Sequence, residues 1–268
     1  MFLPDVAGRC PALLLCHGAG EFKEHYFELG AFLAQRGVLA LAMDMHGHGA
    51  SQGNRYHVVM TEWVADVRAA LDFLSSHSRV EPHRIGAFGL SSGGTAIVEA
   101  ALVDARMKTL VLLDATVRNS FPWMETVVLR ILVGLGHLKK LLTKTDLRVP
   151  LARLAGGLAL TSDPEVDRRL HADPRFEQVF AAFPLPGAAE SLFVDTLERI
   201  PRLRIPTLVL WGEDDKVDPP QTARLLYERL ACKKSLHIIP GNGHLGHLDR
   251  NKAQVFALTA DWVLENMA

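Results

Sequence analysis

Residues 84–94 of the chain read RIGAFGLSSGG, an apolar run of strand type that passes through the pattern G-x-S-x-G into a helical pattern. A serine on such a sharp strand-to-helix turn needs small neighbours, because the strained backbone and the crossing helix leave no room for side chains at Gly89 and Gly93. The helix that starts near Ser92 also points its backbone N–H groups at the site, which favours a developing negative charge. We therefore predict that Ser91 is a nucleophile. The alternative is an ordinary Gly/Ser loop, because the pattern alone also occurs by chance.

The surrounding sequence alternates short apolar runs with longer helical patterns, which is typical of βα units that build a parallel sheet. The apolar runs lie at residues 11–16, 38–43, 84–89, 108–113, 205–211 and 235–239. Apolar residues at helical spacing mark residues 25–36, 61–77, 95–105, 220–231 and 253–267. Nearly continuous apolar runs are expected where helices cover both faces of a sheet. The sequence therefore predicts an α/β fold, with a mostly parallel sheet of about six strands flanked by helices.

The alternation stops after Leu113 and resumes only at Ile205. The residues between them carry no clear strand signal and are punctuated by prolines. Helical patterns cover residues 123–142, 165–170, 175–183 and 188–199. We predict a helical cap of residues 116–202, inserted into a core of residues 1–115 and 203–268. Its apolar stretch 123–133 is expected to pack on the core or line an acyl pocket rather than touch a lipid surface, since it lacks a clear basic face.

A serine hydroxyl is a weak nucleophile without a base, so Ser91 requires a histidine and an acid later in the chain. His244 follows the last predicted strand in the Gly-rich run PGNGH, and His247 is the second choice. The acid is expected at the carboxyl end of a strand, where open parallel sheets place their functional groups. The residues alone leave four candidates open, which are Asp215, Asp214, Asp218 and Asp114.

The loop CHGAGE at residues 16–21 supplies a further requirement of acyl transfer, an oxyanion hole. Such a hole combines the backbone N–H after the nucleophile with another from an early strand-to-helix loop. The expected donors are the backbone N–H groups of Ser92 and Ala19. His17 is expected to brace the loop rather than to enter the chemistry.

The charge balance limits the class of partner. Lys and Arg number 29 against 30 Asp and Glu, so no global field would attract nucleic acid or anionic membranes. Apolar residues make up 49% of the chain, but its apolar stretches are broken well before the ~18 residues that suggest a membrane span. We expect a soluble protein with a small-molecule substrate, no nucleic acid partner and no stable membrane insertion. The oligomeric state is left open.

Cysteine usage and the N-terminal residues indicate the compartment. The three cysteines are Cys10, Cys16 and Cys232. They fit neither a metal spacing nor a disulfide framework, and no signal peptide is visible, so a cytoplasmic location is expected. Asp44, His46 and His48 have no further ligands at metal spacing. We therefore expect no metal and no cofactor.

Taken together, these motifs resemble the α/β-hydrolase superfamily, and in particular its monoacylglycerol lipase and lysophospholipase branch, which is serine aminopeptidase S33-like. The branch carries HGAGE and GHGxSxG, and this chain has HGAGE at residues 17–21 and GHGASQG at residues 47–53. GEDDKVDP at residues 212–219 is similar to the branch's G-x-x-D-x-x-x-P loop, whose aspartate is the acid. GNGHLGHL at residues 241–248 looks like its G-x-G-H-x-x-H-L segment, whose first histidine is the base.

The resemblance selects Asp215 as the acid and His244 as the base of a serine hydrolase. It implies hydrolysis of a carboxylic ester, such as an acylglycerol or a lysophospholipid, through an acyl-enzyme intermediate. The elbow GLSSGG differs from the usual GHSMGG of the branch and is closer to other esterases. Thioesterases, amidases and carbon–carbon bond hydrolases can share the triad, whereas Ser91 argues against relatives with an aspartate or cysteine nucleophile. A non-catalytic ligand-binding protein of the same fold is the alternative from a different class.

Overall fold

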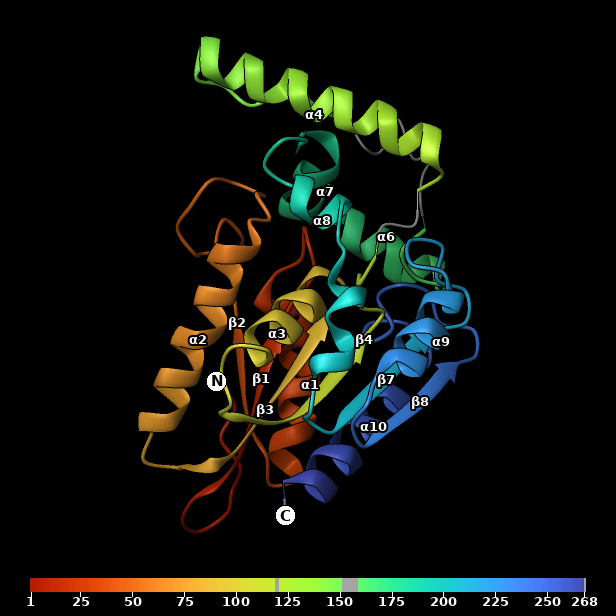
Figure 1. Cartoon of the computed structure of the whole chain (residues 1–268). Helices are drawn as coiled ribbons and strands as arrows, with labels where there is room; N and C mark the ends of the chain where they lie inside the picture. Colours follow the sequence, from red (N-terminus) through yellow and green to blue (C-terminus); the bar gives the residue numbers. More distant parts are fainter. Residues whose placement is uncertain (119–120, 151–158, 268) are drawn as a thin grey trace.

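The computed structural model describes residues 1–118, 121–150 and 159–267 of the chain. Within these residues, the centre of the molecule is one sheet of six strands in the order β2-β1-β3-β4-β7-β8 (Figure 1). The strands are β1 (Cys10–Cys16), β2 (Leu39–Met43), β3 (Val80–Leu90), β4 (Met107–Leu113), β7 (Thr207–Gly212) and β8 (Lys234–Ile239). Every neighbouring pair runs parallel. The predicted α/β fold with about six mostly parallel strands is confirmed.

Alternate side chains of each strand pack on opposite faces of the sheet, which explains why the strands read as continuous apolar runs. Along β1, Ala12 and Leu14 belong to the hydrophobic core on one face, whereas Leu13 and Leu15 belong to the core on the other. The first core includes buried residues of α2 (Met60–Ser76), α3 (Ser92–Ala101) and α9 (Pro220–Arg229). The second includes buried residues of α1 (Phe27–Gln35) and α10 (Lys252–Asn266). The sheet is therefore the middle of three layers (Figure 1).

The register of the sheet aligns the carboxyl ends of its central strands. Cys16 at the end of β1 pairs with Gly89, and Leu113 at the end of β4 pairs with both Leu90 and Leu210. Gly212 at the end of β7 pairs with Ile239 of β8. Five loops therefore begin at nearly the same level of the sheet. This alignment brings together candidate residues that are far apart in the sequence.

The described residues between β4 and β7 form a separate set of elements, in which one long helix is followed by short ones. They are α4 (Trp123–Thr143), β5 (Arg148–Val149), α6 (Pro164–Ala172), α7 (Pro174–Ala181), β6 (Phe183–Pro184), α8 (Ala189–Leu192) and the 3-10 turns η2 (Thr196–Glu198) and η3 (Ile200–Arg202). Two features differ from the sequence prediction. β5 and β6 form a short antiparallel pair, and residues 188–199 form separate short turns instead of one helix. The cap boundaries at residues 116 and 202 stay a prediction.

Helix α4 is the outermost element in Figure 1 and lies beyond α7 and α8, away from the sheet. Its side chains at Trp123, Val128 and Ile131 are 76%, 54% and 58% exposed, and Gly136 is the buried residue of the helix. The expectation that this apolar stretch packs on the core is therefore wrong. The physical reason is that α4 contacts the rest of the insertion near Gly136, which lies against Pro186, so its apolar stripe has no sheet to face. In the described ranges, no helix combines the length and the apolar character needed to cross a membrane.

Candidate active site

Ser91 lies on a strained turn between β3 and α3. Its φ of 50° is in the left-handed region, which non-glycine residues adopt rarely and mostly at functional sites. Helix α3 starts at Ser92, as the sequence predicted. A Cβ at Gly89 would lie 2.6 Å from the carbonyl oxygen of Gly93, and a Cβ at Gly93 would lie 2.4 Å from that of His17. Only glycine fits at either position, as the sequence pattern indicated.

His244 and Asp215, the predicted base and acid, form a hydrogen-bonded pair. The Nδ1–H of His244 donates to Oδ2 of Asp215 at 2.8 Å, and both side chains are buried. Asp215 Oδ1 accepts from the backbone N–H groups of Val217 and Asp218 at 2.8 and 3.0 Å. Burial alone lowers the pKa of His244, but the charge and hydrogen bond of Asp215 reverse this and raise the pKa above its ordinary value. The arrangement fixes one histidine tautomer and stabilises its protonated form.

The hydroxyl of Ser91 has a partner that the sequence did not predict. Ser91 Oγ lies 3.1 Å from Thr116 Oγ1, and Thr116 donates to Asp218 Oδ2 at 2.6 Å. Among the described residues, the hydrogen bond of the Ser91 hydroxyl is thus with Thr116 and not with His244. Thr116 lies three residues beyond β4 in a loop without a sequence motif, so only its position at a strand end could have indicated it.

The loop with the expected oxyanion donors lies on the other side of Ser91. A Cβ at Gly18 would lie 3.2 Å from Cβ of Ser91, so the loop backbone passes directly beside the nucleophile. The backbone N–H groups of Ala19 and Ser92 donate to no protein acceptor in the described part of the chain. His17 is buried; its Nδ1–H donates to Gly18 O at 2.7 Å, and its Nε2 accepts from a backbone N–H at 2.9 Å. Its role is therefore to brace the loop.

Glu21 fixes the same loop, residues 16–21, through both of its carboxylate oxygens. Its Oε2 accepts from Gly18 N–H at 3.0 Å and from the Tyr26 hydroxyl at 2.8 Å. Its Oε1 lies 3.3 Å from both His25 Nδ1 and His247 Nε2. Burial alone would raise the pKa of Glu21, but these partners hold it well below its ordinary value. His247, the second choice for the base, therefore lies beside Glu21 and not at Asp215, and its ring nitrogens have no hydrogen-bond partner among the described residues.

The other three acid candidates have different environments. Asp214 accepts from the Ser162 hydroxyl at 3.3 Å near the surface. Asp114 is fully buried; its Oδ1 accepts from Gly212 N–H at 2.7 Å, while its Oδ2 has no hydrogen-bond partner among the described residues. Burial and the charge of Asp215 raise the pKa of Asp114 well above its ordinary value. Burial also raises the pKa of Asp218 to about 6. Of the four candidates, Asp215 is the one that bonds to the imidazole of His244.

Asp44, His46 and His48 do not converge on a common point. Asp44 accepts from the backbone N–H groups of Lys23 and Ala50, both at 2.9 Å. His48 is buried against Trp63, and burial lowers its pKa to about 3. Across the ranges that the structure describes, no group of three or more His, Cys, Asp or Glu side chains could hold a metal ion. These residues instead stabilise the loop that follows β2.

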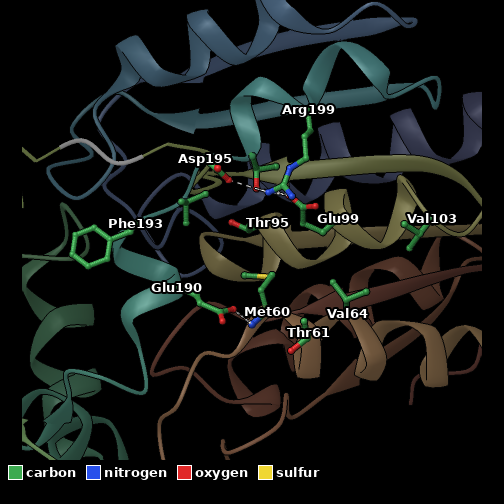
Figure 2. Close-up of a pocket in the computed structure, with 12 residues that line it drawn as sticks. Met60, Thr61, Val64, Thr95, Glu99, Val103, Glu190, Phe193, Asp195 and Arg199 are labelled. Carbon is green, nitrogen blue, oxygen red and sulfur yellow. Dashed lines mark hydrogen bonds and ion pairs between the residues drawn. The ribbon is translucent and has the colours of Figure 1, made fainter. Parts of the chain in front are cut away.

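A cavity of about 460 Å³ lies between α2, α3 and residues 190–199 (Figure 2). Glu99 and Arg199 form an ion pair at its wall, with N···O at 2.8 Å. Neither Ser91 nor His244 lines this cavity, and these residues are only 8% and 6% exposed. The cavity is thus separate from Ser91 and His244, both of which are largely covered by the protein.

Comparisons with known proteins place the chain in a family. Residues 9–251 match the family model described as serine aminopeptidase, S33, so the chain belongs to this family of α/β hydrolases. It is 24% identical over 269 residues to the monoacylglycerol lipase of Mycolicibacterium smegmatis, with 100% of this chain and 92% of that protein covered. A thiohydrolase of Aspergillus aculeatus is 31% identical over 125 residues, which cover 44% of this chain and 39% of that protein. The structure of a soluble variant of monoglyceride lipase from Saccharomyces cerevisiae aligns with a TM-score of 0.76 at 18% identity, covering 100% of this chain and 91% of that one.

Proposed function

We propose that the chain hydrolyses a carboxylic ester, with Ser91 as nucleophile, His244 as base and Asp215 as the acid behind the base. The observation that carries the proposal is the buried 2.8 Å hydrogen bond from His244 Nδ1 to Asp215 Oδ2, at the sheet edge where the strained Ser91 lies. Membership of a hydrolase family and a relative named monoacylglycerol lipase support an ester as the bond that is cleaved.

In the proposed mechanism, His244 Nε2 takes the proton of Ser91 Oγ while Oγ bonds to the acyl carbon. The carbonyl oxygen becomes an oxyanion, which accepts hydrogen bonds from the N–H groups of Ala19 and Ser92. Losing one such donor typically costs about 3 kcal/mol of transition-state stabilisation. Asp215 stabilises the imidazolium, which then gives its proton to the leaving alcohol oxygen as the ester C–O bond breaks.

The second half of the reaction repeats the first with water. A water molecule attacks the acyl carbon and passes one proton to His244, and the tetrahedral intermediate is held by the same two N–H groups. When the bond from Ser91 Oγ to the acyl carbon breaks, His244 returns the proton to Oγ and the carboxylic acid leaves. The free enzyme is restored without any cofactor.

The substrate class is proposed to be a small acyl ester, such as an acylglycerol or a lysophospholipid. The relative named monoacylglycerol lipase covers the whole of this chain, which favours this class. A thioester is the second candidate, because a relative named thiohydrolase is 31% identical over part of the chain. Amides and activated carbon–carbon bonds can use the same triad. A non-catalytic ligand-binding role is disfavoured, because such proteins usually lose a triad member and this chain has all three candidates.

Ser91→Ala and His244→Ala test the proposal directly. Each is expected to lower kcat for a p-nitrophenyl ester of a short acid by roughly 10⁴-fold or more, since members of a triad act as a unit. His247→Ala, which removes the neighbouring histidine on the donor-loop side, is the matched control and is expected to keep the triad. If His247→Ala abolished turnover and His244→Ala did not, the base would be His247.

A fluorophosphonate probe separates an enzyme from a binding protein of the same fold. We expect the probe to label the intact protein at Ser91, with labelling lost in Ser91→Ala. A folded wild-type protein that never reacts would contradict the enzymatic proposal. Chain-length profiles on p-nitrophenyl esters, monoacylglycerols and acyl thioesters would then rank the substrate classes.

A further inference from the structure

Thr116 contacts the nucleophile through both its backbone and its side chain. Its backbone N–H donates to the carbonyl oxygen of Ser91 at 3.3 Å, and its hydroxyl oxygen lies 3.1 Å from Ser91 Oγ. The Thr95 hydroxyl, one turn into α3, donates to the carbonyl oxygen of Thr116. Ser91 N–H in turn donates to Leu113 O at 3.1 Å at the end of β4. The segment after β4 is therefore tied to the elbow on both sides of Ser91.

Asp218 determines which hydroxyl group donates and which accepts in the hydrogen bonds that link Ser91, Thr116 and Asp218. Its carboxylate is buried and accepts the Thr116 hydroxyl proton at 2.6 Å. A threonine hydroxyl has a single proton, so once that proton is given to Asp218, Thr116 can only accept from Ser91. The backbone of Asp218 is fixed, because its carbonyl oxygen accepts from the Trp211 indole at 2.8 Å and its N–H donates to Asp215 at 3.0 Å. The relay therefore runs from Ser91 to Thr116 to Asp218.

This relay lies beside the acid–base pair. Thr116 follows β4, which lies in the sheet between β3, which Ser91 follows directly, and β7, whose loop carries Asp215 and Asp218. A hydroxyl that donates to Thr116 thus has its oxygen directed toward the acid loop and not toward the donor loop at Gly18. From that position, rotation of the Ser91 side chain exchanges Thr116 for His244 as the acceptor of the hydroxyl proton.

We propose that Thr116 is a positioning residue for the nucleophile: together with Asp218, it holds the hydroxyl of Ser91 on the acid-loop side in the free enzyme and releases it when His244 accepts its proton. The inference rests on the proposed function of Ser91. No covalent bond changes in this step. The hydrogen bond from Ser91 to Thr116 is exchanged for one from Ser91 to His244, and the acyl transfer then proceeds as described above.

Thr116→Val is the first test, because valine keeps the shape of threonine and removes the hydroxyl. We expect kcat on a short p-nitrophenyl ester to fall by about five- to tenfold, the size expected for one hydrogen bond, with KM nearly unchanged. The second-order rate of fluorophosphonate labelling at Ser91 should fall by a similar factor. Thr116→Ser, which keeps the hydroxyl, is expected to stay within about twofold of the wild type.

Thr109→Val is the matched control for folding. Thr109 lies on β4, is fully buried, and its hydroxyl donates to Pro206 O at 3.1 Å, so the same change removes one buried hydrogen bond away from Ser91. We expect a similar loss of thermal stability in the two valine variants but a loss of kcat only in Thr116→Val. An equal loss of kcat in Thr109→Val, an unchanged rate in Thr116→Val, or no rescue by Thr116→Ser would each overturn the inference. A wild-type protein that neither hydrolyses the ester nor reacts with the probe would instead overturn the proposed function.

Asp218→Asn tests the far end of the relay by a pH profile. Asp218 faces three titratable groups, which are His244, Asp215 and Asp114 on the loops that follow β8, β7 and β4. Its charge is one of the causes that raise the pKa of His244, so its removal lowers that pKa. We expect the acid limb of kcat/KM to move to lower pH, with a smaller loss of kcat than in Thr116→Val because the amide oxygen can still accept from Thr116. An acid limb that stays in place would show that the charge of Asp218 does not reach the site.

Discussion

The two sides of Ser91 treat buried carboxyl groups in opposite ways. On the donor-loop side, Glu21 is buried but surrounded by Gly18 N–H, the Tyr26 hydroxyl and two histidines, and its pKa is well below the ordinary value. On the acid side, the carboxyl groups of Asp114 and Asp218 are also buried, and their pKa values are raised. Burial raises the pKa of all three carboxyl groups, and the neighbouring His247 and His25 reverse this effect for Glu21.

The donor-loop side and the acid side of Ser91 have different physical tasks. The donor-loop side uses one ionised carboxylate to fix a backbone conformation, so its contribution is to geometry. The acid side gathers Asp114, Asp215 and Asp218 around one histidine, and backbone donors satisfy Asp215 most fully. Burial and the neighbouring carboxyl groups raise the pKa of Asp114 and of Asp218, and the charges of all three carboxyl groups raise the pKa of His244 against the effect of its burial. The contribution of this side is to the proton affinity of His244.

The largest effect is expected from Asp215→Asn on the acid side. An amide cannot hold the imidazolium and presents the wrong group to Nδ1 of His244, so kcat on a short acyl ester should fall by roughly 10³- to 10⁴-fold. Asp214→Asn is the matched control from the adjacent position in the same loop, and it should keep a near-normal rate because Asp214 contacts Ser162 near the surface. A near-normal rate for Asp215→Asn would mean that another carboxyl group is the acid behind His244. The donor-loop side and the acid side of Ser91 would then no longer differ as described.

On the donor-loop side, Glu21→Ala removes the carboxylate that holds the loop in place. The change leaves Gly18 N–H and the Tyr26 hydroxyl without their acceptor, so the loop beside Ser91 loses its fixed position. We expect a loss of kcat of roughly 10- to 100-fold, as a displacement of about 1 Å can cost 10²-fold. The free energy of unfolding should fall by about 3 kcal/mol, measured by denaturant titration. Glu21→Gln, which keeps one oxygen acceptor, should lie between the wild type and Glu21→Ala.

The pH dependence of this stability loss follows from the lowered pKa of Glu21. A carboxyl group with a folded pKa below its unfolded value of about 4.3 stabilises the protein above that pH, and the stabilisation is lost as the pH falls through the folded pKa. The difference between wild type and Glu21→Ala should therefore be full at pH 7 and shrink in acid. Glu24→Ala is the control, since Glu24 is a more exposed carboxylate of the same segment. An equal loss in Glu24→Ala would mean that local charge, and not the buried network, stabilises the loop.

The sequence predicted the sheet and the residues at its carboxyl edge because both follow from local rules. Apolar runs between helical patterns identify buried parallel strands, and a glycine on each side of Ser91 leaves a steric signature at the turn. Because Asp215 and His244 each follow a predicted strand, the sequence alone predicts that they lie at the same edge of the sheet. These are features that one short stretch of chain can encode.

Other features depend on what lies across the molecule and were missed. Thr116 is a half-buried loop residue whose role arises only when β3, β4 and β7 lie side by side and bring Asp218 to it. Residues 123–133 look like a buried helix from their apolar content, but the part of the chain that the structure describes leaves the apolar side chains of α4 exposed. Residues 188–199 have helical spacing yet form separate turns. Spacing predicts which face is apolar, and the tertiary contacts decide whether that face is covered.

The smallest effect on kcat is expected from Asp114→Asn. This change removes a carboxyl group of the acid side that is inferred to carry no charge. The raised pKa of Asp114 means that the folded protein holds a proton that the unfolded chain releases above a pH of about 3.9. Stability contributed by this group therefore falls as the pH rises toward the folded pKa, whereas asparagine has no proton to lose. An amide oxygen can still accept from Gly212 N–H, and asparagine tolerates the φ of 44° at this position.

Asp114→Asn should thus keep kcat within about twofold and raise the melting temperature more at pH 8 than at pH 5. Asp5→Asn, which removes one exposed carboxyl group, is the control for the change in net charge and should shift neither quantity. A large loss of kcat in Asp114→Asn would mean that this carboxyl group is ionised and supports His244. The two sides of Ser91 would then use buried charge in the same way, and the contrast between them would rest on Asp218 alone.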